Sequence, residues 1–150
     1  MLDQLFNSIG GSVIGSLTEK TGLNLDQAKS VLPIAQDTMK TGLMDEAKAG
    51  NIGGILSMFN SKGDSLQSND LFGKLKGMLM QNILSKLGLP ESMSAIVAGT
   101  GMTSIVENAS QFLSGDEEVK KSDLMSKFDM GSIAGDMLKD KLGGIGKMFG

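Results

Sequence analysis

The carboxylate run Asp116-Glu117-Glu118 is a first candidate for chemistry, because neighbouring carboxylates can act as an acid and base pair or bind a metal ion. The run follows Gly115, but it lacks the alternating Asp and Asn ligands and the glycine of a calcium loop. Carboxylates at the start of a helix also interact favourably with the helix dipole. We therefore interpret the run as a solvated helix start.

The absent residue types exclude most catalytic sites. The sequence has no His, Cys, Tyr or Trp, and all 14 basic residues are Lys. Without imidazole or thiol there is no Ser-His-Asp triad, no cysteine nucleophile and no thiolate or imidazole metal site. A Ser-Lys dyad, a carboxylate pair or an oxygen-liganded metal remain, and none has a recognisable spacing. We expect no enzyme, with no catalytic, cofactor-binding or metal-binding residues.

A glycine-rich stretch and the charge distribution bear on nucleotides and nucleic acids. Gly99-Thr100-Gly101 lacks the rest of a phosphate-binding loop, so it is interpreted as a turn between helices. The net charge is −3, the pI is about 4.9 and the lysines are scattered. A phosphate-backbone binder needs a dense basic face, so no nucleic-acid partner is expected.

No apolar run approaches the length of about 18 residues that a transmembrane helix needs. The opening residues carry Asp3 where a secretory signal would carry Lys or Arg. From these two features we expect a soluble, cytoplasmic protein.

The segment from Asp70 to Leu87 predicts a central helix with apolar residues on more than one side. Asn69 or Asp70 can cap its start, and Gly88 can end it in the left-handed conformation. The chain contains 12 Met, which indicates an interior of adaptable side chains. Ordinary core filling is favoured over a Met-lined binding groove.

Shorter helices are predicted on both sides of this segment. In the N-terminal half, we expect a helix from Leu2 that breaks near Gly10-Gly11 or is held there by a close neighbour. A second helix, capped by Asn24 and Gln27, contains Pro33, so it should kink or split into two pieces near Leu32 and end at Gly42. Gly11 and Gly15 share one face of the first helix, which favours tight intramolecular packing over a dimer contact.

Further short helices are expected along the rest of the chain. One spans the segment from Gly50 to Phe59, and the polar stretch 60–69 forms a connection. After that connection and the central helix, Pro90 should open a helix that runs to Ala98. Ser104 and Glu107 fit a capping box for the next helix.

The tail 122–150 has three competing interpretations: a last core helix, a self-association arm or a helix on a membrane surface. Together with the central helix, it supplies our candidate interaction surface, which is apolar and rich in Met and Gly. Its residues are Met78, Met80, Ile83, Gly131, Ile133, Met137 and Leu138.

Two segments of the chain align without gaps when Gly22 is aligned with Gly88. Lys20-Thr21-Gly22-Leu23 and Lys86-Leu87-Gly88-Leu89 each lie between two apolar helical segments. Either a duplication or low-complexity composition produces such a match. The helix-turn-helix geometry of each half is predicted in both cases.

Several sequence segments resemble the bacterial YidB-like family, which is catalogued as domain of unknown function 937. They are Leu84-Ser85-Lys86-Leu87-Gly88-Leu89, the small and apolar helix after it, the Asp-rich break from Gly115 to Asp123, and Phe128-Asp129-Met130-Gly131-Ser132-Ile133. The opening Met1-Leu2-Asp3-Gln4-Leu5 and the stretch from Thr21 to Pro33 are similar too. The sequence departs from the family in having more Met and fewer Ala and Gln. The resemblance implies an all-helical bundle and no assigned activity.

We therefore predict a single all-α domain over 1–150, a bundle of about six or seven short helices with Gly-rich turns. Its N-terminal half is 1–60 and its C-terminal half is 70–150. The favoured function is a non-enzymatic interaction or self-associating module whose partner is itself or another protein. The alternatives are a carrier of an apolar small molecule or lipid in a Met-lined groove and, more distantly, a DNA-binding helix-turn-helix.

Overall fold

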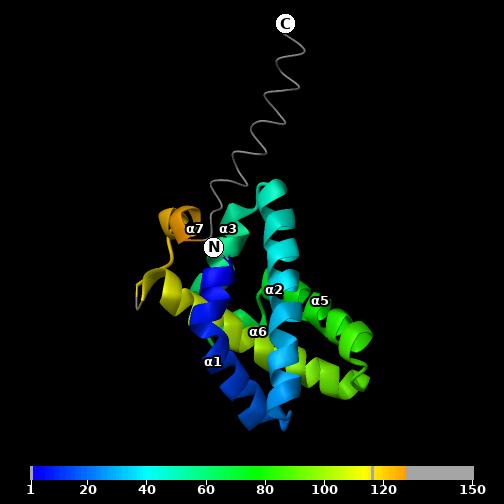
Figure 1. Cartoon of the computed structure of the whole chain (residues 1–150). Helices are drawn as coiled ribbons and strands as arrows, with labels where there is room; N and C mark the ends of the chain where they lie inside the picture. Colours follow the sequence, from blue (N-terminus) through cyan, green and yellow to red (C-terminus); the bar gives the residue numbers. More distant parts are fainter. Residues whose placement is uncertain (1, 116, 128–150) are drawn as a thin grey trace, which may run out of the picture.

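The computed structural model describes residues 2–115 and 117–127. Within these ranges the chain forms seven helices and no strand, which confirms the predicted all-α fold (Figure 1). The helices are α1 (Leu2–Thr21), α2 (Leu25–Lys48), α3 (Ile52–Asn60), α4 (Asp64–Gln67), α5 (Asp70–Leu87), α6 (Glu91–Ser114) and α7 (Lys121–Lys127).

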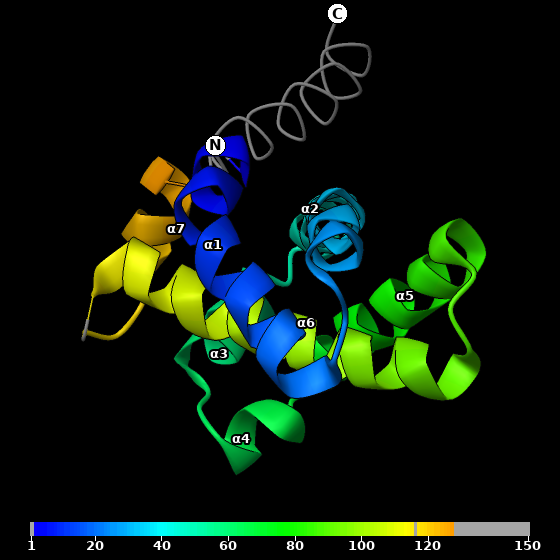
Figure 2. The same cartoon turned by 60° about the horizontal axis from the view of Figure 1, so that its bottom comes forward.

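Two helical hairpins make up the bundle. Gly22-Leu23-Asn24 joins α1 to α2, and Gly88-Leu89-Pro90 joins α5 to α6. Gly22 has φ 75° and Gly88 has φ 64°, a left-handed conformation that side chains disfavour. α1 packs on α6 and α5 packs on α2, and Figures 1 and 2 show α6 crossing α1. Each hairpin therefore covers the other.

The two hairpins match position by position under a shift of 66 residues, the shift that places Gly22 on Gly88. This shift carries the bounds of α2, Leu25–Lys48, onto those of α6, Glu91–Ser114. Among residues 4–21, whose burial is described, it also carries every buried apolar side chain of α1 onto a buried apolar side chain of α5. The pairs are Leu5 and Leu71, Phe6 and Phe72, Ile9 and Leu75, Val13 and Leu79, and Leu17 and Ile83.

Most buried positions of α2 and α6 agree in the same way. The matched pairs are Ala28 and Ser94, Val31 and Val97, Ala35 and Gly101, Thr38 and Ser104, Met39 and Ile105, Leu43 and Ala109, and Ala47 and Leu113. A chance match of composition does not preserve helix bounds, turn conformation and burial together. The sequence repeat therefore corresponds to two structurally equivalent hairpins that pack on each other.

Most of the predicted helix caps are confirmed. Asn24 accepts a hydrogen bond from the Gln27 N–H at 2.8 Å, and the Gln27 side chain accepts one from the Asn24 N–H at 3.2 Å, which is the expected capping box. Asn69 caps α5 by accepting from the Phe72 N–H at 3.0 Å. Pro90 precedes α6 at the cap position instead of lying in its first turn.

Each of the first two helices is continuous, so the break, the split and the early end expected in them were wrong. The alternative expected for the first helix, a close neighbour at Gly10, is confirmed. α1 is continuous through Gly10, where an added Cβ atom would lie 3.3 Å from Leu32 Cδ1, so a close neighbour covers this glycine. α2 continues through Pro33 and past Gly42. Pro33 is exposed, as is Lys29 one turn earlier, so the carbonyl group that Pro33 leaves unbonded can be hydrated.

The predicted break in α6 was also wrong. Gly99-Thr100-Gly101 lies inside the helix, and Ser104 is buried in its middle instead of capping a new one. At Gly101 an added Cβ atom would lie 3.6 Å from Leu17 Cδ2, where α1 crosses closely. Packing on both sides of the helix therefore outweighs the low helix propensity of glycine.

The core contains fully buried Met39, Met58 and Met102, so these methionines do fill the interior as expected. The connection 60–69 is not purely polar, since it contains α4 and the fully buried Leu66. Figure 2 shows α4 at the edge of the bundle.

Gly42 lies where α2 approaches α5 closely, because a Cβ atom there would lie 2.1 Å from Leu75 Cδ2. We expect Gly42→Ala to lower the free energy of unfolding by about 1–3 kcal/mol through overpacking, as measured by urea unfolding. In a Leu75→Ala background this penalty should disappear, because the clashing methyl group is gone. Equal losses in both backgrounds would refute the contact.

Gly11→Ala is the matched control for this measurement. Gly11 is exposed in α1 and nothing lies within 4 Å of an added Cβ atom. The substitution should raise stability by up to about 1 kcal/mol, the helix propensity difference between Ala and Gly.

Candidate interaction surfaces

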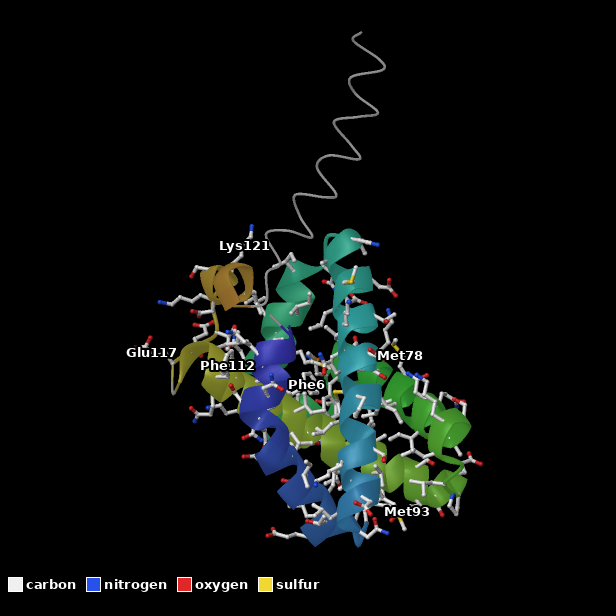
Figure 3. The ribbon with its side chains drawn as sticks, viewed as in Figure 1. Phe6, Met78, Met93, Phe112, Glu117 and Lys121 are labelled. Atoms are coloured by element: carbon white, nitrogen blue, oxygen red, sulfur yellow. The ribbon has the colours of Figure 1, made fainter. Side chains whose placement is uncertain are left out.

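The predicted surface residues of α5 divide between the surface and the core. Met78 and Met80 are partly buried and pack against the core, and Figure 3 shows Met78 on the side of α5 that faces α2. Ile83 is fully buried, so it belongs to the core and presents no surface. The four tail candidates, Gly131, Ile133, Met137 and Leu138, lie outside the described residues.

The outward face of α1 is open at its glycines. Gly11 is exposed and Gly15 half-buried, and nothing lies within 4 Å of a Cβ atom added at either. The expected tight intramolecular packing at this pair is therefore wrong. The alternative, a dimer contact, stays a prediction.

A groove of about 390 Å³ lies between α1, α4 and α6. Gln67 on α4 donates a hydrogen bond to Thr103 on α6 at 3.1 Å. Lys20, Thr100 and Glu107 also line it, and Ile96 contributes an apolar side chain that is 53% exposed. Its lining is mixed and mainly polar.

A second groove, of about 620 Å³, lies between α3, the C-terminal half of α6 and the segment before α7. Asn60 closes one end by bonding both the carbonyl and the N–H of Val119, at 2.9 and 2.7 Å. Glu117 and Glu118 also line it, and Figure 3 shows Glu117 at the outer end of the segment that follows α6.

The described residues of the acidic run, Glu117 and Glu118, do not lie in a helix. α7 begins at Lys121, after Glu117 and Glu118, and both of these are exposed. At the start of α7, the Asp123 carboxylate instead accepts a hydrogen bond from the Lys120 N–H at 2.9 Å. For Glu117 and Glu118 the expectation of solvation is met, whereas that of a helix start is not. Asp116 lies outside the described residues.

Two hydroxyl contacts join the hairpins at equivalent positions. Asn82 on α5 donates to the buried Thr38 on α2 at 2.8 Å, and the buried Ser104 on α6 donates to Ser16 on α1 at 3.3 Å. The shift of 66 residues carries Thr38 onto Ser104 and Ser16 onto Asn82. Buried polar groups need partners, so these contacts fix how one hairpin sits on the other.

Residue-by-residue extension of the repeat would have paired these positions from the sequence alone. It would not have shown that Asn82 touches Thr38 or that Ser104 touches Ser16, because contact between the hairpins depends on how the helices cross.

One polar network ties α2 to α5 and to the start of α3. Lys74 lies 2.9 Å from the Glu46 carboxylate, and Asn51 donates to the same carboxylate at 2.5 Å. The Asn51 oxygen in turn caps α3 by accepting from the Gly54 N–H at 3.1 Å. The hydrogen bond from Asn51, followed by that from Lys74, lowers the pKa of Glu46 below its ordinary value of 4.5.

The described residues contain neither a metal site nor a membrane-spanning helix. No group of three or more acidic side chains there could hold a metal ion. No helix in residues 2–115 or 117–127 is long and apolar enough to cross a membrane.

Comparison with known proteins gives no relative. No protein-family model matches the chain, and neither a curated protein nor a solved structure matches it significantly. The resemblance to the YidB-like family therefore stays a prediction.

We expect Glu46→Gln to lower the melting temperature at neutral pH, because it removes the charge that Asn51 and Lys74 stabilise. A lowered folded-state pKa contributes stability above the ordinary value of 4.5, and that stability is lost as the pH falls through the lowered value. The difference in melting temperature between the variant and the unmodified protein should therefore disappear at acidic pH. Thermal unfolding across a pH series measures this difference. Glu19→Gln on α1 is the charge-matched control, and a gap that persists unchanged in acid would refute this assignment.

Proposed function

We propose that this protein is a non-enzymatic helical module that acts by binding protein, with a second copy of the same chain as its partner. The observation that carries the proposal is the repeat: the chain contains two equivalent hairpins, and each is the binding partner of the other. A face that already recognises an equivalent hairpin is suited to recognise one from another molecule.

The composition of the chain supports a binding role. Imidazole and thiol are absent from the sequence, so the common catalytic and metal sites have no residues to build them. The accessible features are Met78 and Met80 on α5, the open glycine face of α1, and the two grooves along α6. Each of these features is accessible to contact by another protein.

The carrier alternative has less support. A site for an apolar small molecule or lipid is lined mainly by apolar side chains. Both grooves described above carry many polar side chains, and Met39, Met58 and Met102 are enclosed in the core. Membership of the YidB-like family is part of our proposal for this chain, and it assigns no activity that would favour the carrier.

Light-scattering mass across a concentration series tests the proposal. We expect the intact chain to exceed the monomer mass of 15.7 kDa increasingly as the concentration rises, because association follows mass action. A monomer at every concentration would contradict self-association.

A chain truncated after Lys127 keeps all seven helices and locates the contact. If the truncated chain still associates, the contact lies within residues 1–127. If it becomes monomeric, the contact requires the segment that contains Gly131, Ile133, Met137 and Leu138.

A further inference from the structure

The interface between the hairpins is nearly self-complementary. α1 meets α6 as α5 meets α2, and the shift of 66 residues exchanges these two contacts. The buried stripe of α1 and that of α5 have the same spacing, and each interface contains one hydroxyl contact, Ser104 with Ser16 or Thr38 with Asn82. Such an arrangement within one chain is that of a two-fold dimer whose subunits have been joined.

A short segment joins the two units. α3 follows α2 without leaving the bundle, and residues 61–63 then lead to α4 on the outside, as Figure 2 shows. Lys62 and Gly63 are exposed, and Gly63 has φ 55°, which requires glycine. Three residues span roughly 10 Å at full extension. A hinge this short favours exchange of units between chains.

We propose that residues 2–60 of one chain pack on residues 64–127 of a second copy, so that the hairpin interface is also the self-association interface. In the exchanged dimer every buried contact between hairpins is kept, and only the conformation of residues 61–63 changes. The hydrogen bonds of Asn60 with Val119 are likewise re-formed, between chains. This inference rests on the proposed self-association and names its surface.

The absence of cysteine in the sequence allows a direct test with the full chain. Ser16 and Ser104 come from different units, and their Oγ atoms are 3.3 Å apart. Ser16→Cys and Ser104→Cys variants, one labelled with ¹⁵N, are unfolded together, refolded at high concentration and oxidised. We expect a disulfide-linked heterodimer, identified by mass, whose yield rises with the refolding concentration.

The controls separate exchange from random collision. Ser12, exposed on α1 one turn before Ser16, supplies a Ser12→Cys variant that should give a several-fold lower yield with Ser104→Cys. The double variant Ser16→Cys/Ser104→Cys, refolded dilute, should close its disulfide within one chain and so verifies the geometry.

The outcomes distinguish this inference from the proposed function. A heterodimer yield no higher than that of the Ser12 control, with the intrachain disulfide intact, overturns hairpin exchange. If light scattering then still shows dimers, self-association stands and uses another surface. If it shows only monomers, both proposals fall.

Discussion

The structure depends on the burial of two equivalent apolar stripes, one on α1 and one on α5, each against a helix of the other hairpin. Neither stripe can be covered within a two-helix hairpin, because a hairpin is only one layer thick. Packing α1 on α6 and α5 on α2 covers both at once. Two further features accompany this crossing: Gly42 allows α2 and α5 to approach closely, and the buried hydroxyl groups of Thr38 and Ser104 find partners on the opposite hairpin.

Local chemistry predicted where most helices begin, whereas tertiary packing decided where they continue. The caps at Asn24 and Asn69 and the end of α5 at Gly88 were predictable, because a short side-chain oxygen or a left-handed glycine acts within one turn of the chain. The breaks expected at Gly42 and at Gly99-Thr100-Gly101 were wrong, because those glycines lie where one helix packs against another. The sequence alone cannot distinguish a glycine that ends a helix from one that admits a neighbour.

The interaction surface was less predictable than the fold. Apolar periodicity places Ile83 and Met80 on neighbouring positions of α5, but only the packing of α2 and α6 shows that Ile83 is buried. The Gly22 and Gly88 alignment did contain the essential information. Extended along both hairpins, it makes Ser16 equivalent to Asn82 and Thr38 equivalent to Ser104. The structure adds that the contacts join the other combinations, Asn82 with Thr38 and Ser104 with Ser16.

The central claim is that the two hairpins stabilise each other and form one cooperative unit. Native-state hydrogen exchange as a function of denaturant tests it most directly, because it measures the opening free energy at single amides. The account predicts that the amides of Val13 in α1 and Leu79 in α5 exchange with the same free energy and the same denaturant dependence. If one hairpin exchanged through an opening of clearly lower free energy while the other stayed protected, the claim would be contradicted.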